Sequence, residues 1–366
     1  MSEHVIVYHD PGFWASTPAN NGGNGPTWQW EDELLIGFTR GTFLQADKGH
    51  QCTYDRPFES HLARSTDGGA SWTTWKPSGF AGNLNTAEAQ PLTSGLDFSG
   101  EGFVLRAEGA GYHGNRAARW FHSDDRGASW HGPHAFTGLL DHPELAGKEF
   151  TARTAYVVDG PRELSLFLTV RRRKKEPNEL GISLEEKTFL ARTGDGGMSF
   201  RFVAWAVPWE DPHRAAMPAP VRLSPTRLIA AARRKSAEHN WIDCFHSTDD
   251  GATWSFLSRI TRTEVANEWN GNPPSLVRMS DGRLCTVYGN RTDRQMQARY
   301  SGDGGATWSA PQVLRDDFRS ANGFPDLGYP RLFQRPDGRL VTTYFWCTAE
   351  RPQTHIAATA FSPPDG

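Results

Sequence analysis

The sequence predicts an all-β fold in which several similar antiparallel sheets form one closed array, and three observations support this prediction. An eight-residue pattern, Ser/Thr-x-Asp-x-Gly-x-x-Trp/Phe, begins at residues 65, 123, 193, 247 and 301, and such recurrence is typical of a repeated supersecondary unit. The chain contains 37 glycines and 24 prolines, which favour short strands and turns over long helices. Its 14 tryptophans supply the large aromatic surfaces that packed sheets bury.

Each position of the repeated pattern has a local role in a tight turn between two strands. The Asp accepts backbone hydrogen bonds, the Gly permits a positive φ, and the aromatic residue returns to the core. We therefore expect these Asp residues to be structural rather than catalytic. The five copies resemble the Asp-box, or BNR repeat, of the sialidase superfamily. This resemblance implies a β-propeller.

Paired apolar runs predict the first two strands of each blade. In the first five blades they occupy residues 26–30 and 34–40, 90–92 and 102–106, 151–158 and 164–171, 218–223 and 228–233, and 273–279 and 284–291. A sixth pair, 329–333 and 340–346, has a third strand at 355–361 but no room for a fourth, which residues 4–8 can supply. The sequence thus predicts one domain over residues 1–366, with six four-stranded antiparallel blades closed by the N-terminal strand in the last blade.

Charge, cysteine usage and hydropathy narrow the classes of function. The formal net charge of −3 gives no general attraction to nucleic acid or anionic membranes, so neither is an expected partner. Cys52, Cys244, Cys285 and Cys347 form no Cys-x-x-Cys pair, which predicts buried free thiols, and no metal or cofactor motif occurs. No apolar run reaches the roughly 18 residues of a membrane span. We expect a cytoplasmic protein, or a secreted or periplasmic one if a signal peptide has been removed.

An arginine ends the second strand of each of the first five blades: Arg40, Arg106, Arg171, Arg233 and Arg291. The inner strands of a propeller begin around its channel, so we expect these cations near one mouth. Each charge-assisted bond from a guanidinium to a carboxylate contributes roughly 1.5 to 3 kcal/mol, which favours an acidic glycan, a sialic acid or a uronate, as the substrate. The alternative is that some of them pair with acids of the blades.

The run Arg-Arg-Arg-Lys-Lys at residues 171–175 precedes an acid-containing stretch that extends to residue 186. Its mixed charges predict an exposed loop between strands. A basic rim for an acidic substrate is the functional alternative to a solvated hairpin.

The resemblance to sialidases implies roles for particular residues. In that family three arginines hold the substrate carboxylate, a Tyr with a Glu partner is the nucleophile, and a loop Asp is the acid/base. Tyr329, at the start of the sixth inner strand, is similar in position to the nucleophile, and Asp55 to the acid/base. Arg233 and Arg294 are similar to the second and third carboxylate-binding arginines, with Arg291 as a competitor of Arg294.

Two positions depart from the family pattern. The Arg-Ile-Pro element of the first inner strand is replaced by Pro-Thr-Trp-Gln-Trp at residues 26–30. The Glu partner of the nucleophile is expected just before the blade-four strand, where residues 214–217 read Arg-Ala-Ala-Met. We therefore expect a sialidase scaffold whose substrate is not sialic acid.

A loop at residues 48–57 offers a different chemistry. His50 or Tyr54, beside an arginine-rich mouth, can abstract the proton α to a uronate carboxylate, and an imidazole pKa of about 6.5 suits such a base. Tyr112 and His113 form a second pair of this kind. Cleavage would then proceed by β-elimination rather than by hydrolysis.

The sequence favours an exo-acting glycoside hydrolase of the sialidase type acting on an acidic or polar glycan, and two alternatives remain open. An exo-acting glycoside hydrolase would use Asp55 and Tyr329, and a polysaccharide lyase would use His50 or Tyr54. The third is a sugar-binding propeller without catalysis. All three take a glycan or oligosaccharide partner, which the arginines predict to be acidic, and none requires a cofactor.

Overall fold

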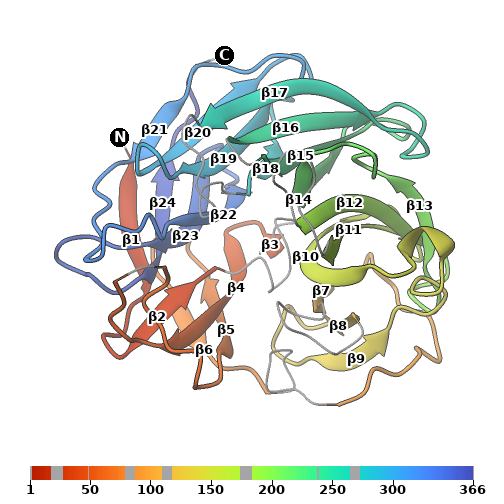
Figure 1. Ribbon diagram of the computed structural model, residues 1–366, viewed down its shortest axis with the longest axis horizontal. Coiled ribbons are helices and arrows are strands. Elements are labelled where there is room, and N and C mark those ends of the chain that lie inside the picture. Colours follow the sequence, from red (N-terminus) through yellow and green to blue (C-terminus); the bar gives the residue numbers. More distant parts are fainter. Residues whose placement is uncertain are drawn as a thin grey trace.

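The computed structural model describes residues 2–17, 28–47, 49–78, 87–108, 118–173, 184–236, 239–263 and 273–365. Six sheets stand in chain order around a ring (Figure 1). Within the described residues, the one helical element is a short 3-10 turn, Pro143–Leu145. No helix in this described part is long and apolar enough to cross a membrane. The predicted all-β, six-bladed propeller is confirmed.

The blades follow one another along the chain. Blade one contains β2 (Phe13–Ser16) and β3 (Trp28–Trp30), which both pair with β4 (Glu33–Thr42), then β5 (Glu59–Ser65) and β6 (Thr73–Trp75). Blade two contains β7 (Val104–Glu108), β8 (Arg119–Ser123) and β9 (His131–Ala135). Blade three contains β10 (Glu149–Val158), β11 (Leu164–Arg173), β12 (Leu184–Thr193) and β13 (Arg201–Trp205).

The other three blades have four strands each. Blade four contains β14 (Arg214–Arg222), β15 (Leu228–Lys235), β16 (Asn240–Ser247) and β17 (Ser255–Thr263). Blade five contains β18 (Ser275–Arg278), β19 (Leu284–Asn290), β20 (Gln295–Ser301) and β21 (Gln312–Arg315). Blade six contains β22 (Gly328–Gln334), β23 (Leu340–Trp346), β24 (His355–Phe361) and β1 (Glu3–Tyr8).

The N-terminal strand closes the ring as predicted. β1 pairs antiparallel with β24, with Glu3 opposite Ala360. Val7 of β1 packs in one buried cluster with Ile36 of blade one and Phe345 of blade six. Because burial of one such aliphatic side chain contributes about 1.5 to 3 kcal/mol, the closing strand is held by core packing as well as by its ladder.

Blade two departs from the prediction of an inner strand at residues 90–92. Gln90 instead makes one parallel bridge to His134, at the edge formed by β9. Tyr156 of blade three reaches this region: its hydroxyl accepts hydrogen bonds from the backbone N–H of Leu105 (2.9 Å) and from Nε1 of Trp28 (3.0 Å). One buried hydroxyl thereby ties blades one, two and three together, and it satisfies an N–H of β7.

The five repeated turns have one geometry. In the first turn, the Ser65 hydroxyl donates to Asp67 (2.8 Å) and accepts from the Gly69 N–H (2.8 Å). The same oxygen of Asp67, Oδ1, also accepts from the Ser71 N–H at 2.9 Å, and Oδ2 accepts from the Ser71 hydroxyl at 2.6 Å. Equivalent bonds to the carboxylate recur at Asp125, Asp195, Asp249 and Asp303. The hydrogen bond from Ser71 lowers the pKa of Asp67 to about 2, and the carboxylate serves its own turn.

Because neighbouring strands in each blade are antiparallel, the ring has two structurally different ends. The second strands finish, and the first strands of the next blades begin, at one end, which we call the mouth end; the repeated turns lie at the opposite, or turn, end. Bulges interrupt three inner strands near the mouth end, in β10, β14 and β22. Bulges re-aim side chains and recur next to functional sites.

The charged run at residues 171–186 is partly strand rather than loop. β11 continues to Arg173 and β12 begins at Leu184, while residues 174–183 lie outside the described residues. Arg171 is buried and donates to Glu149 at 2.8 Å. Arg171 and Arg172 of β11 lie opposite Glu186 and Glu185 of β12. These cross-strand pairs of opposite charge extend the β11–β12 hairpin beyond its apolar residues. The four cysteines are buried and free, as predicted.

Candidate functional site

A histidine from blade one and an aspartate from blade six form an ion pair at the mouth end. His50 lies in the loop after β4, and Asp326 lies two residues before β22. Nδ1 of His50 is 2.8 Å from Oδ1 of Asp326, whose side chain is 5% exposed. The second carboxylate oxygen accepts a hydrogen bond from Nε1 of Trp14 at 2.8 Å. Two residues that are 276 positions apart in the sequence are thus in direct contact.

The imidazole of His50 is held on several sides. Its ring centroid lies 5.1 Å from that of Trp14 and 5.8 Å from that of Phe324. Asn322 donates to the carbonyl oxygens of Ala46 (2.8 Å) and Gly49 (3.2 Å), which fastens the His50 loop to the segment that carries Asp326. One third of the His50 side chain remains exposed. The ring is therefore oriented without being sealed from solvent.

The protonation of this pair follows from its surroundings. Burial disfavours the charged form of Asp326, but the attraction and hydrogen bond of His50, with Arg291 and Trp14, outweigh burial and hold its pKa below the usual value. An ionised Asp326 only accepts, so Nδ1 of His50 carries the donated proton. In the neutral ring, Nε2 then has a free lone pair and can act as a base.

Arg291 contacts both Tyr329 and the segment that carries Asp326. Tyr329 occupies the bulge of β22 with φ of +53°, and the Thr17 hydroxyl donates to its carbonyl oxygen at 2.8 Å. Cζ of Arg291 is 5.9 Å from the centroid of the Tyr329 ring, and Nε of Arg291 donates to the Leu327 carbonyl at 3.3 Å. The charge of Arg291 also lowers the pKa of Asp326, so this cation is close to both the Tyr329 ring and the Asp326 carboxylate.

Met217 occupies the place beside Tyr329 where the sialidase pattern has a glutamate. Met217 lies in the bulge of β14 with φ of +58° and packs against Tyr329. Arg233 points Nη1 toward its sulfur at 3.6 Å. The structure therefore brings Arg233, Arg291 and Tyr329 together as a group, with a thioether where a carboxylate base is expected.

The other predicted site residues lie in different surroundings, and their roles stay predictions. Arg294 donates to the Gly323 carbonyl at 3.2 Å. Arg106 is fully buried near Glu108 and Arg119, and burial lowers its pKa to about 9. Arg40 donates to Glu59 at 2.6 Å and to the hydroxyl of Tyr8 at 3.1 Å, at the junction of blades one and six.

Two predicted catalytic residues are exposed at the loop surface. Asp55 forms a small turn in which its N–H bonds the Thr53 hydroxyl at 3.1 Å. Tyr54 is 72% exposed and lies 5.6 Å from the Phe58 ring. Tyr112 and His113 are outside the described residues.

Sequence reasoning missed Asp326 and Trp14, and it identified Met217 only as part of a segment that lacks the expected glutamate. Asp326 is the acid just before the sixth inner strand, a position that the blade register places at the mouth end. Its partnership with His50 depends on the ring being closed, which no local pattern encodes. In the described part of the chain, no cluster of three or more His, Cys, Asp or Glu residues is arranged to hold a metal ion.

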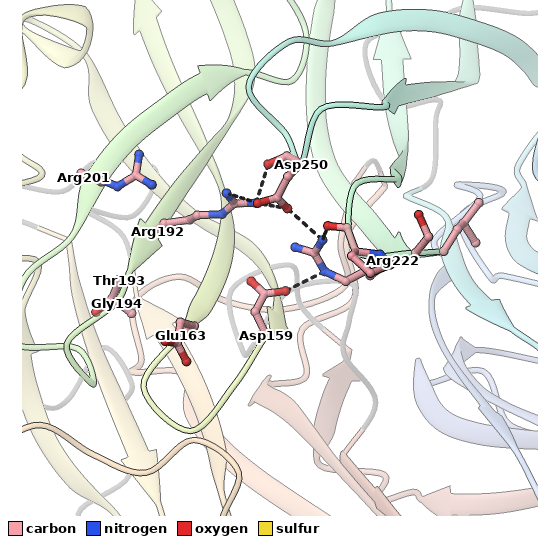
Figure 2. A pocket seen from close by; sticks show the side chains of 11 residues that line it. Asp159, Glu163, Arg192, Thr193, Gly194, Arg201, Arg222 and Asp250 are labelled. Atoms are coloured by element: carbon pink, nitrogen blue, oxygen red, sulfur yellow. Dashed lines mark hydrogen bonds and ion pairs between the residues drawn. The ribbon is translucent and has the colours of Figure 1, made fainter.

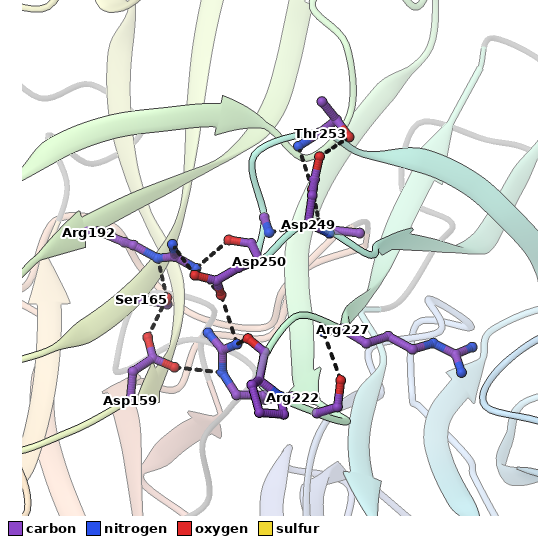
Figure 3. A network of polar contacts seen from close by, with 12 residues as sticks. Asp159, Ser165, Arg192, Arg222, Arg227, Asp249, Asp250 and Thr253 are labelled. Atoms are coloured by element: carbon purple, nitrogen blue, oxygen red, sulfur yellow. Dashed lines mark hydrogen bonds and ion pairs between the residues drawn. The ribbon is translucent and has the colours of Figure 1, made fainter.

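A separate cavity of about 660 Å³ lies at the turn end, between blades three and four (Figure 2). Arg192 donates to the carboxylate of Asp250 at 2.7 and 2.8 Å, and to its carbonyl oxygen at 2.6 Å. Arg222 bridges Asp250 (2.8 Å) and Asp159 (2.7 Å), as Figure 3 shows. These residues come from both blades, so the network ties the blades together.

Similar arginines bond repeated turns between other blades. Arg64 donates to the Arg126 carbonyl at 2.6 Å, and Arg227 to the Gly304 carbonyl at 3.2 Å. Because the contact recurs between different blades, we read the arginines of the cavity as structural. Arginines at the turn end connect neighbouring blades, and the candidate catalytic residues lie at the mouth end.

Comparisons with solved structures find proteins of similar fold. A protein of unknown function from Dyadobacter fermentans DSM 18053 superposes with a TM-score of 0.67 at 19% identity, over 98% of this chain and 97% of its own. The Hadza microbial sialidase Hz136 gives 0.57 at 17%, over 95% and 66%. The Penicillium chrysogenum α-L-arabinanase complexed with arabinobiose gives 0.56 at 12%, over 99% and 98%. A comparison with proteins of curated function finds no match.

The fold is a six-bladed β-propeller that is similar to the folds of this sialidase and this arabinanase. Residues 103–342 match the model of the BNR repeat-like domain. The chain therefore belongs to the BNR repeat-like family.

Proposed function

We propose that the protein cleaves a glycan next to an acidic sugar by β-elimination, with His50 as the base. The observation that carries the proposal is the 2.8 Å pair of His50 and the buried Asp326. A carboxylate that accepts from Nδ1 fixes the tautomer and leaves Nε2 to take a proton, the usual arrangement of a catalytic histidine.

The neighbouring residues fit the remaining steps of this reaction. Arg291, together with Arg233, binds the uronate carboxylate and neutralises it, which acidifies the proton on the adjacent ring carbon. Nε2 of His50 takes that proton, a carbon–carbon double bond forms in the ring, and the bond from the ring to the glycosidic oxygen breaks. Tyr329 supplies a proton to the departing oxygen. No water is consumed, and one product carries an unsaturated uronate.

Hydrolysis is the second candidate, because the structural neighbours include an arabinanase and a sialidase. A sialidase mechanism needs a carboxylate beside the tyrosine nucleophile, and most glycosidases need a pair of carboxylates. Met217 stands beside Tyr329, Asp326 is engaged by His50 and Trp14, and Asp55 is exposed in its own turn. The described mouth therefore fits elimination better than hydrolysis.

The test incubates the protein with sialosides and with uronate-containing oligosaccharides, and reads both mass and ultraviolet absorbance. Elimination gives an absorbing product without added water, and hydrolysis gives a non-absorbing product that has gained water. We expect His50→Ala to lower kcat by about 10² to 10⁴-fold, the usual range for a lost general base. Asp326→Asn should lower it by about 10- to 100-fold, because the ring loses its anionic support.

Two further variants separate the mechanisms. Asp55→Ala should leave elimination unchanged, whereas it removes the acid/base of the hydrolase alternative. Tyr329→Phe should lower the rate in both mechanisms, but only elimination also requires His50. Turnover that survives His50→Ala and is abolished by Asp55→Ala would contradict the proposal, as would binding without any turnover.

A further inference from the structure

Two tryptophans and two cations form a patch on blade three, at the mouth end. We call Lys148, Arg172, Trp205 and Trp209 the blade-three rim. The indole centroids of Trp205 and Trp209 are 5.2 Å apart. Nζ of Lys148 is 4.4 Å, and Cζ of Arg172 is 5.1 Å, from the Trp209 ring. Two positive charges therefore converge on one partly exposed indole.

Lys148 and Arg172 each have N–H groups that can donate to a ligand in addition to those bonded within the protein. Lys148 donates to the Glu144 carbonyl at 2.7 Å, and an ammonium has two more N–H groups. Arg172 is 46% exposed and bonds Glu185 through Nε and one Nη at 2.9 and 2.8 Å, which leaves its other Nη. The Glu144 carboxylate accepts from Nε1 of Trp205 at 2.9 Å. Burial and the repulsion of Arg172 both lower the pKa of Lys148, consistent with a site that an anion would stabilise.

The position of the rim relates it to the candidate catalytic pair. Lys148 directly precedes β10, and Arg172 lies at the far end of β11, so both belong to the mouth end. Blade three is three positions from blade six around the ring, and the two blades lie on opposite sides in Figure 1. His50 and Asp326 lie at the junction of blades one and six. A glycan chain that crosses the mouth from His50 therefore reaches blade three.

We infer that the blade-three rim is a second binding site for an acidic sugar unit, whose carboxylate or sulfate bonds Lys148 and Arg172 while its ring packs against the tryptophans. The substrate would accordingly be an extended polyanionic glycan. The role of the blade-three rim in catalysis rests on the proposed function. Binding of a polyanion to the rim does not depend on that function.

The test measures binding to the full chain carrying His50→Ala, so that turnover cannot consume the probe. Polygalacturonate presents carboxylates alone, and dextran sulfate presents sulfates alone; a galacturonate disaccharide is the short probe. Lys148→Gln and Arg172→Gln are compared with Arg201→Gln, which removes one positive charge at the turn-end cavity. Glutamine keeps part of the aliphatic stem that covers the indole. Thermal unfolding checks that each variant folds.

We expect each rim variant to weaken binding of one polymer by about tenfold to a hundredfold, as for the loss of one charge-assisted bond. Arg201→Gln should change it by less than about twofold, as for an exposed charge away from the site. The polymer that shows this pattern identifies the anion. Equal losses for Arg201→Gln, no loss for either rim variant, or equal losses for the disaccharide would each overturn the inference. Polymer binding with the expected losses, but without elimination by the unmodified protein, would refute only the proposed function.

Discussion

At the residue scale, Tyr329 and Met217 share an unusual backbone conformation. Each has a positive φ, +53° and +58°, and each directly precedes a proline in the bulge of an inner strand. A bulky side chain in this region costs on the order of 1 to 3 kcal/mol, so surrounding contacts must hold it. The Thr17 hydroxyl does so at the Tyr329 carbonyl. The strain brings side chains from blades four and six into contact at the mouth, where the proposed chemistry occurs.

A glycine occupies a position of positive φ in each repeated turn, where a larger side chain would be strained. This allows a comparison of two glycines within one turn. Gly305 has φ of +95°, and an added Cβ would lie 3.3 Å from Sγ of Cys244 and from Cδ2 of Leu257. Gly302, three residues earlier, has no such φ and open space around it. Gly305→Ala should therefore lower the free energy of unfolding by about 1 to 3 kcal/mol, and Gly302→Ala by less than about 0.5 kcal/mol. Urea denaturation measures both, and equal values would contradict the argument.

At the element scale, the inner edges of the first two blades depart from a single four-stranded ladder. Blade one makes its inner edge from two strands, β2 and β3, and blade two has no inner strand among its described residues. The Tyr156 hydroxyl compensates by bonding Leu105 of β7 and Trp28 of β3. The centre of the ring therefore depends on one side chain where other blades use a ladder.

Tyr156→Phe tests this dependence. The variant keeps the ring but leaves the Leu105 N–H and the Trp28 Nε1 without their acceptor. Each unsatisfied buried donor costs about 1 to 3 kcal/mol, so the free energy of unfolding should fall by about 2 kcal/mol or more. Tyr54→Phe removes the same hydroxyl from a side chain that is 72% exposed, and should change it by less than about 0.5 kcal/mol. A chemical denaturation curve for Tyr156→Phe that coincides with that of the unmodified protein would refute the tie.

Some strands of the propeller can be located from the sequence alone, and others cannot. The strand at residues 355–361 and the starts at Leu164, Leu228 and Leu340 match the prediction, because dense apolar runs are bounded there by turn residues. The run at 90–92 has similar residues but lies against the edge at β9. Whether a short run pairs at the inner or the outer edge is decided by tertiary packing, which local patterns do not contain.

At the scale of the whole molecule, the two ends of the ring differ: the turn end holds the contacts between blades, and the mouth end holds the residues of the proposed function. The turn end uses Asp-centred turns and arginine contacts to fasten blades, and these roles could be predicted because each turn is local. The mouth end joins His50 to Asp326 across the closing junction. The blade register placed His50, Tyr329, Arg233 and Arg291 near one mouth, but only the closed ring shows that Asp326 orients the histidine and that Met217 faces the tyrosine.

Buried histidines make the stability of the whole ring sensitive to pH. Burial lowers the pKa of His122, His134 and His355 to about 4, against about 6.5 in an unfolded chain. His122 and His134 also share a 3.0 Å hydrogen bond between Nδ1 and Nε2, which full protonation would abolish. Between pH 6.5 and 4 the unfolded state binds more protons, so stability is lost as pH falls through this window, and the loss is complete below about pH 4.

The size of this loss can decide whether the protein folds in acid. His355 alone contributes up to about 3 kcal/mol, because its pKa lies about 2.5 units below the unfolded value and each unit corresponds to 1.36 kcal/mol. Domains have only about 5 to 15 kcal/mol in total, so losses of this size from the buried His122 and His355 would remove a large share of the stability by pH 4. Urea denaturation at a series of pH values should show His355→Asn to flatten the slope by up to about 1.4 kcal/mol per pH unit. Stability that stays constant from pH 6.5 to 4 would show that these histidines reach solvent in the folded protein.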